Sequence, residues 1–210
     1  MLCVHCGVRL PGQGLSPLRH AAASLSANVE RPVTASPAEL RDLPSPRLIF
    51  AVLLAITGGL FGILGAMQAE LPSLLLAPFI WGPVAEEVLK PAGLYVMLIK
   101  WPAALRNRAC TATLSAIAGI AFGLVESTIY VTVYAPEHSQ AYLLFRFTVP
   151  VMLHAVASFV FGMGINRQLL LPLTGSGSFR ASNWVFFLCA IVIHSSYNVV
   201  VTVLGVLDKI

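Results

Sequence analysis

Residues 111–134 read TATLSAIAGIAFGLVESTIYVTVY, which is 24 residues with a single charged side chain, Glu126. A helix that crosses a bilayer needs about 20 predominantly apolar residues, so this stretch predicts a transmembrane helix with one carboxylate inside it. Four further stretches are long and apolar enough to span: residues 47–67, 71–99, 143–165 and 183–207. The sequence therefore predicts an all-α, polytopic transmembrane bundle of about five spans.

The second stretch is the least regular of the five. It is overlong and is interrupted by Pro78, Pro83 and Pro91. Because proline suits the first turn of a helix, we expect a short segment that leads into a helix beginning at Pro83. Glycines at helical spacing in the first and third spans predict close helix packing; they are Gly58, Gly62, Gly65, Gly119 and Gly123.

The composition supports a membrane location. Hydrophobic residues make up 57% of the chain and charged residues 10%, whereas a soluble domain carries about 25% charged residues. The net charge of +4 comes mostly from arginines outside the spans, so we interpret it as a topology signal and not as a nucleic-acid-binding surface. Positive side chains dominate the N-terminal tail and the loops after the second and fourth spans, with Arg146 as an exception. This pattern predicts a cytoplasmic N-terminus.

Residues 1–46 differ in kind from the membrane domain predicted over residues 47–210. They are rich in Pro, Ser and Ala and lack the apolar core of a signal peptide, which predicts a loosely ordered tail. Cys3 and Cys6 form a C-x-x-C that looks like one knuckle of a zinc ribbon. Such a site needs four ligands, so the pair is either two reduced thiols or is completed by His5, by His20 or by a second copy of the chain.

Polar residues inside the spans are the candidate functional site. They are Glu86, Glu87 and Lys90 in the second span, Glu126 in the third, His154 in the fourth, and His194 with Asn198 in the fifth. Each charged residue at a helix centre costs about 2.5–3.5 kcal/mol, and Lys90 can reach either neighbouring glutamate on its helix. At about 1.5 Å per residue, the polar groups of four helices fall in one layer near the middle of the bilayer. We therefore expect them to form one site.

The residue types alone leave several functions open. Intramembrane Glu and His can form the proton relay of a transporter, although no inverted repeat is evident. They can bind zinc, although no H-E-x-x-H is present and the ligands would have to converge from four helices. They can also hold together a non-catalytic scaffold that binds other membrane helices. The sequence gives no information on the oligomeric state.

The order of the motifs resembles a known family. Residues 86–90 read EEVLK (E-E-x-x-K), residues 122–126 read FGLVE (F-x-x-x-E), His154 stands in the next span, and residues 194–198 read HSSYN (H-x-x-x-N). Over about residues 71–207 this set is similar to the PrsW-like intramembrane proteases, relatives of the CAAX-prenyl endopeptidases and bacteriocin-immunity proteases. The CAAX-type enzymes have His where this chain has Glu126, so that position follows the PrsW pattern.

The resemblance implies an endopeptidase of a prokaryotic cell membrane that acts on membrane-anchored proteins, with anti-sigma factors as the model substrate. It also implies a glutamate-based mechanism without metal, and we predict no cofactor. Glu86 or Glu87 is then the base that activates water, and His154 positions the water or relays its proton. His194 and Asn198 donate to the oxyanion. Glu126 is either a second carboxylate or the hydrogen-bond partner that fixes a histidine tautomer.

Overall fold

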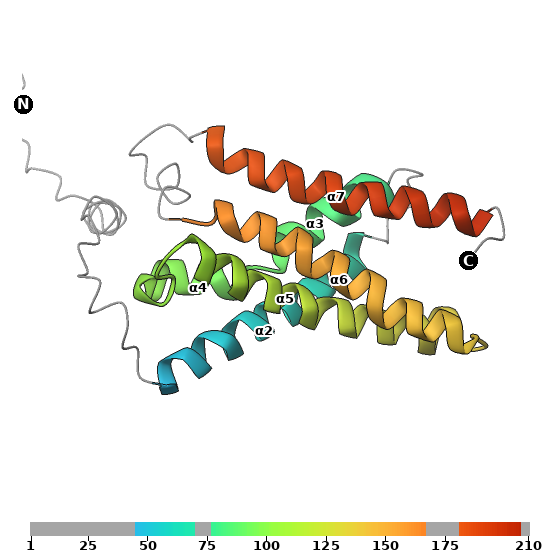
Figure 1. Ribbon diagram of the computed structural model, residues 1–210, viewed down its shortest axis with the longest axis horizontal. Coiled ribbons are helices and arrows are strands. Elements are labelled where there is room, and N and C mark those ends of the chain that lie inside the picture. Colours follow the sequence, from blue (N-terminus) through green and yellow to red (C-terminus); the bar gives the residue numbers. More distant parts are fainter. Residues whose placement is uncertain (1–44, 70–76, 167–180, 207–210) are drawn as a thin grey trace, which may run out of the picture. The chain divides into compact units, whose positions relative to one another are not determined.

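The computed structural model describes residues 45–69, 77–166 and 181–206, and every regular element in these ranges is helical (Figure 1). The long helices are α2 (Ser45–Ala69), α5 (Arg108–Ile129), α6 (Gln140–Gly164) and α7 (Ala181–Val206), and α5 continues into the π-helical turn η3 (Tyr130–Tyr134). Four helical segments are long and apolar enough to cross a membrane. The chain is thus an all-α integral membrane protein, as its composition predicted.

The second apolar stretch is not one continuous helix. It contains the π-helical turn η1 (Ala77–Trp81), the short helix α3 (Gly82–Leu89) and the helix α4 (Ala92–Lys100). Pro83 lies in the first turn of α3, as expected, and Pro91 is the N-cap of α4. Proline has no backbone N–H and clashes with the preceding helical turn, so Pro91 ends the first helix. Glu86, Glu87 and Lys90 therefore lie at the end of a short helix.

Side-chain caps begin two of the long helices. The Asn107 side chain accepts a hydrogen bond of 2.8 Å from the backbone N–H of Cys110 at the start of α5. The Ser139 hydroxyl accepts one of 3.1 Å from the backbone N–H of Tyr142 at the start of α6. Each cap satisfies a backbone donor that has no partner within its helix. A 3₁₀ turn, η2 (Pro102–Ala104), lies between α4 and α5.

Helix α6 lies between α5 and α7, and α5 also packs against α2 (Figure 1). Glycines allow these close approaches, as predicted. A Cβ atom at Gly119, one of the predicted glycines, would lie 2.3 Å from the backbone oxygen of His154, and one at Gly59, which was not among them, would lie 2.2 Å from that of Ala118. The backbone of α6 that carries His154 therefore rests directly on α5.

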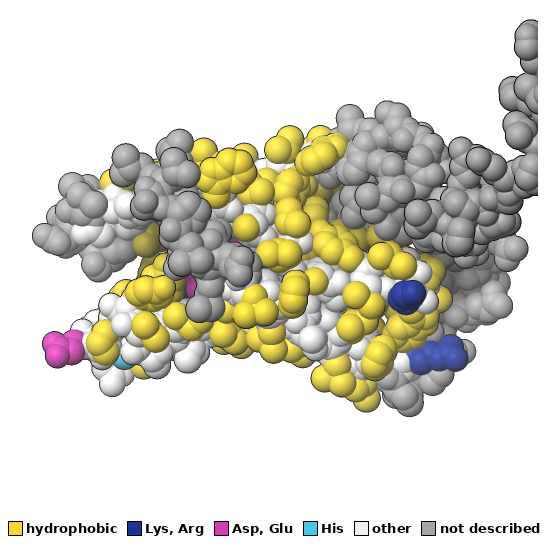
Figure 2. Space-filling view, turned by 180° about the vertical axis from the view of Figure 1, so that it is seen from behind, with side chains coloured by type: hydrophobic (Ala, Val, Ile, Leu, Met, Phe, Trp, Pro, Cys, Tyr) yellow, Lys and Arg dark blue, Asp and Glu magenta, His cyan; other side chains and the backbone are white. Residues whose placement is uncertain are grey.

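The outer faces of the helices are apolar. Figure 2 shows a face covered mainly by hydrophobic side chains, with Lys and Arg at one end and acidic side chains at the other. Lys100 and Arg108 are exposed near the connection between α4 and α5, whereas Glu137 is exposed between α5 and α6. Such a surface fits a hydrocarbon environment. The predicted tail over residues 1–46, including its C-x-x-C, lies outside the described residues except for its last two positions.

Candidate functional site

Five of the six predicted site residues meet in one connected network between four helices. Helix α3 contributes Glu86 and Glu87, while α5 contributes Glu126, α6 His154 and α7 His194. All are buried except Glu126, whose side chain is 23% exposed. The sixth, Asn198, is half-buried and lies one turn after His194 on α7. The convergence expected from the depth count is therefore present.

Lys90 lies at the centre of this network and is fully buried. Its Nζ is 2.8 Å from Glu87 Oε1, 3.2 Å from Glu86 Oε2 and 2.8 Å from His154 Nδ1. The ammonium also lies 4.2 Å from the centre of the Phe122 ring, a favourable cation–π distance. One cation thus contacts both neighbouring carboxylates, and it contacts a histidine from another helix as well.

The two contacts of His154 define its tautomer. An ammonium group can only donate hydrogen bonds, so His154 Nδ1 accepts from Lys90 at 2.8 Å. The proton of a neutral ring then resides on Nε2, which lies 3.0 Å from Glu126 Oε2. His154 therefore donates to Glu126 and accepts from Lys90.

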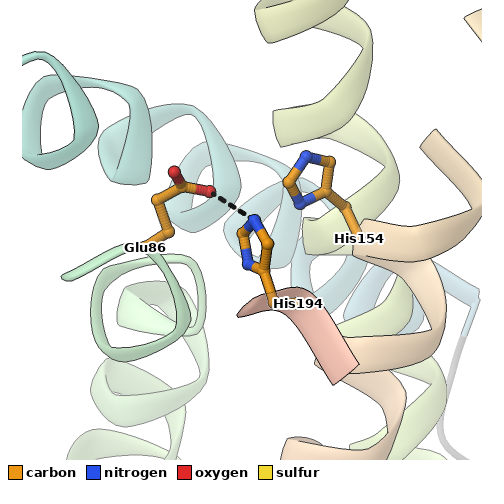
Figure 3. A group of neighbouring side chains, drawn as sticks. All are labelled: Glu86, His154 and His194. Carbon is orange, nitrogen blue, oxygen red and sulfur yellow. Dashed lines mark ion pairs between the residues drawn. The ribbon is translucent and has the colours of Figure 1, made fainter. Parts of the chain in front are cut away.

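The Glu87 carboxylate orients His194 in a similar way. Its Nδ1 lies 2.9 Å from Glu87 Oε1, the same oxygen that accepts from Lys90. A carboxylate accepts only, so Nδ1 carries the proton and Nε2 of the neutral ring is an acceptor. That Nε2 lies 3.7 Å from Glu86 Oε2, and Figure 3 shows the Glu86 carboxylate and the two imidazole rings turned toward one another. Two acceptors thus face each other across a short gap.

Glu86 and Glu87 have different environments although they are adjacent in sequence. The Glu87 side chain is fully buried, and its Oε1 accepts from both Lys90 and His194. The Glu86 side chain is 10% exposed. Its Oε2 is within 3.2 Å of Lys90 Nζ, but among the described residues no donor has hydrogen-bonding geometry toward it. Glu87 Oε2 is likewise buried without a hydrogen-bond partner among the described residues, so the two carboxylates differ in the two donors that Glu87 Oε1 accepts and in the slight exposure of the Glu86 side chain.

Sequence reasoning did not place Arg146 in the site. Its Nη2 lies 3.4 Å from Glu126 Oε2, and its Cζ lies 3.8 Å from the centre of the Tyr130 ring. Arg146 was interpreted only as an exception to the charge pattern of the loops. Its position inside a predicted span was the available signal, because a charged residue there needs a partner.

The cluster also contains a possible set of metal ligands. Glu86, His154 and His194 each offer one ligand atom, and these atoms lie within 4.8 Å of one another. Two His and one Glu form the ligand set of several catalytic zinc sites. However, Lys90 contacts two of the three residues, and an ammonium about 4 Å from a dication would cost about 8 kcal/mol at an effective dielectric constant of about 20. The donor types fit zinc, but their arrangement around a buried ammonium does not.

Comparison with known proteins gives one family. A family model described as "PrsW family intramembrane metalloprotease" matches residues 47–209. The comparisons with curated proteins and with solved structures gave no significant match. The matched range contains the whole Glu–His–Lys network, so the family match and the candidate site lie on the same part of the chain.

Proposed function

Because the chain belongs to the PrsW family of intramembrane proteases, we propose that its buried network hydrolyses peptide bonds of membrane-embedded proteins with a water molecule activated by Glu86. One observation carries this proposal. Glu86 Oε2 and His194 Nε2 are both acceptors and lie 3.7 Å apart. A water molecule has two hydrogens to donate, so one water molecule can donate to both acceptors. Its oxygen lone pair is then directed away from both acceptors, toward a substrate carbonyl.

The reaction follows from this placement. The water oxygen forms a bond to the scissile carbonyl carbon while Glu86 takes one of the water protons. The carbonyl oxygen becomes an oxyanion, and we assign the Asn198 side-chain amide as its donor, because Asn198 follows His194 by one turn on the same face of α7. When the C–N bond breaks, Glu86 returns the proton to the leaving amine. The carboxylate is thereby regenerated and no cofactor is consumed.

The remaining members of the network hold these groups in place. Glu87 accepts from His194 Nδ1 at 2.9 Å, which leaves His194 Nε2 as the acceptor for the water. Lys90 bridges Glu86, Glu87 and His154, and so fixes the end of α3 against α6. Glu126 accepts from His154 Nε2 at 3.0 Å, the role of a partner that fixes a histidine tautomer. Preorganisation of this kind supplies much of an enzyme's rate acceleration.

Zinc-dependent hydrolysis is the second candidate. It is favoured by the description of the matching family as metalloproteases and by the short distances between the ligand atoms of Glu86, His154 and His194. In that mechanism a bound zinc would lower the pKa of a water molecule and polarise the carbonyl. The ammonium of Lys90, 2.8 Å from His154 Nδ1, argues against it, because it occupies the position that a metal bound to this nitrogen would need.

The test compares membranes of cells that produce the native chain, Glu86→Gln or the control Glu137→Gln. Glu137 is exposed in the α5–α6 connection, so its substitution makes the same chemical change away from the network. New N-termini in membrane proteins are identified by mass spectrometry. We expect the same fragments with the native chain and with Glu137→Gln, and none with Glu86→Gln.

Other outcomes reject parts of the proposal. Fragments that persist with Glu86→Gln exclude Glu86 as the base. Loss of cleavage with phenanthroline, restored by added zinc, makes the zinc mechanism correct. If the native chain produces no fragments but dissipates a pH gradient in proteoliposomes, the chain acts as a transporter and the protease function is wrong.

We also propose that the protein resides in a prokaryotic cell membrane with its N-terminus in the cytoplasm. Exposed Lys100 and Arg108 lie at the connection expected on the cytoplasmic side, and exposed Glu137 at the opposite one. Labelling of Lys100→Cys and Glu137→Cys variants in intact cells by a membrane-impermeant thiol reagent tests this. Only the second should react. Membrane-anchored anti-sigma factors, suggested by the family resemblance, are the first substrates to examine.

A further inference from the structure

Arg146 is a second buried cation near the network, and none of the four motifs includes it. It lies in the second turn of α6, and only 6% of the residue is exposed. A buried charge is costly in a membrane helix unless it is paired. The residue therefore needs an explanation that the proposed chemistry of Glu86 and His194 does not give.

The end of α5 holds Arg146 through both its side chain and its backbone. The guanidinium lies over the Tyr130 ring at 3.8 Å, and Nη2 contacts Glu126 Oε2 at 3.4 Å. The buried hydroxyl of Ser127 donates a hydrogen bond of 2.6 Å to the backbone oxygen of Arg146. Two side-chain contacts and one backbone contact, all to residues 126–130, fix the position of Arg146 relative to Glu126.

Glu126 connects Arg146 to the catalytic network through a single atom. The oxygen that contacts Arg146, Oε2, is also the acceptor for His154 Nε2 at 3.0 Å. A carboxylate can only accept hydrogen bonds, so the Glu126 carboxylate at this distance selects the tautomer of His154 with the proton on Nε2. Arg146 Nη2 and His154 Nε2 meet on this one oxygen, so the guanidinium holds the Glu126 carboxylate against the ring. A Glu126 side chain that loses this contact and turns away no longer selects the Nε2–H tautomer of His154.

The tautomer of His154 determines whether Lys90 can stay where it is. With the proton on Nε2, His154 Nδ1 accepts from Lys90 at 2.8 Å. With the proton on Nδ1, two donors face each other at that distance and the ammonium has to move. Lys90 also contacts Glu86 and Glu87, so its displacement disturbs the proposed base.

We propose that Arg146 is a positioning residue of the active site: it holds the Glu126 carboxylate against His154, which keeps His154 in the Nε2–H tautomer and Lys90 at the centre of the network. The inference rests on the proposed function only for its catalytic consequence. The tautomer itself is a property of the protein without substrate. Arg146 acts through Glu126 and touches no reacting atom.

The direct test is ¹⁵N NMR of histidine-labelled protein in lipid nanodiscs. The signals of His154 are identified as those missing from a His154→Gln variant. In the native chain we expect a single neutral tautomer with the proton on Nε2. We expect the nitrogen shifts of Arg146→Gln to move toward a mixture of tautomers, and those of Arg146→Lys to stay close to native. Arg108→Gln is the control, because Arg108 is exposed at the start of α5.

Unchanged His154 shifts in Arg146→Gln would overturn the inference. Since no substrate is used, this result is independent of whether the chain cleaves proteins by the proposed mechanism. Circular dichroism shows whether each variant is folded. If Arg146→Gln does not fold, Arg146→Lys decides: native shifts support the inference, and a mixture of tautomers in a folded Arg146→Lys overturns it.

A double-mutant cycle tests the catalytic consequence, with a fluorogenic transmembrane peptide taken from a cleaved protein as the probe. Partners that orient active-site histidines contribute about 10- to 100-fold to activity at metal sites, and we expect a fall in kcat of this size for Arg146→Gln with KM unchanged. Arg146→Gln in the Glu126→Gln background should cause no further loss, because the two residues act through one contact. A positioning role would be contradicted if the double variant lost activity by the product of the two single losses. A rise in KM with kcat unchanged would contradict it as well.

Discussion

Substitution of Lys90 by Met tests whether the buried ammonium is what holds the network together. Met approximates the length and volume of Lys and can keep the contact with Phe122, so the change removes the charge with little loss of packing. The ammonium lies within 3.2 Å of two buried carboxylates, those of Glu86 and Glu87, and 2.8 Å from His154 Nδ1. The variant thus leaves two carboxylates without a cation.

The magnitude follows from the burial of the partners. Removing one member of a buried ion pair costs about 3–5 kcal/mol, because the remaining charge is left uncompensated. Proteins are stable by about 5–15 kcal/mol in total, so the loss is a large fraction of the free energy of unfolding. In Lys90→Met combined with Glu87→Gln one of the stranded charges is removed, and we expect part of the stability to return.

The assay is reversible unfolding by SDS in mixed micelles, followed by circular dichroism. Lys100→Met is the matched control, because Lys100 is exposed at the end of α4, and exposed substitutions stay within about 0.5 kcal/mol. If Lys90→Met unfolds at the same SDS fraction as the native chain and this control, Lys90 does not stabilise the network and the reasoning is refuted.

Two further predictions concern the same network. Gly119→Ala should cost about 1–3 kcal/mol of stability and reduce cleavage, because its Cβ would lie 2.3 Å from the His154 backbone oxygen. Gly205→Ala is the control, because a Cβ there has no atom within 4 Å and the variant should behave as the native chain. Equal effects of the two substitutions would contradict the packing argument. Isothermal titration calorimetry with zinc should show binding to Lys90→Met and none to the native chain, because only the variant lacks the ammonium that contacts His154 Nδ1. Tight zinc binding by the native chain would favour the zinc mechanism.

The long helices were predictable because apolar length is a local property of the sequence. The stretch 143–165 differs from α6, Gln140–Gly164, by three residues at one end and one at the other. The second stretch was harder, since a proline can begin, end or kink a helix. Pro83 lies in the first turn of α3, which begins one residue earlier at Gly82, but the end of α3 before Pro91 became clear only from the structure.

The site was predictable as a set of residues but not as a set of contacts. Counting residues along each span gives the depth of a side chain, and this predicted that Glu86, His154 and His194 would meet. Which atoms meet depends on the rotation of each helix about its axis, and that is fixed by packing far from the site. The sequence thus indicated Lys90 as a counter-ion for the glutamates, but not its contact of 2.8 Å with His154 Nδ1.

The charges and contacts of the network distinguish Glu86 from the other two glutamates. Glu86, Glu87 and Glu126 carry three negative charges and Lys90 and Arg146 carry two positive charges, so with both imidazole rings neutral one negative charge of the network has no cation of its own. Arg146 neutralises Glu126, and Glu87 accepts from both Lys90 and His194. Glu86 shares Lys90 with Glu87, at the longer distance of 3.2 Å, and its Oε2 lies 3.7 Å from His194 Nε2. A carboxylate oxygen that faces an imidazole nitrogen, where one water molecule can donate to both, has the placement that we propose for the general base.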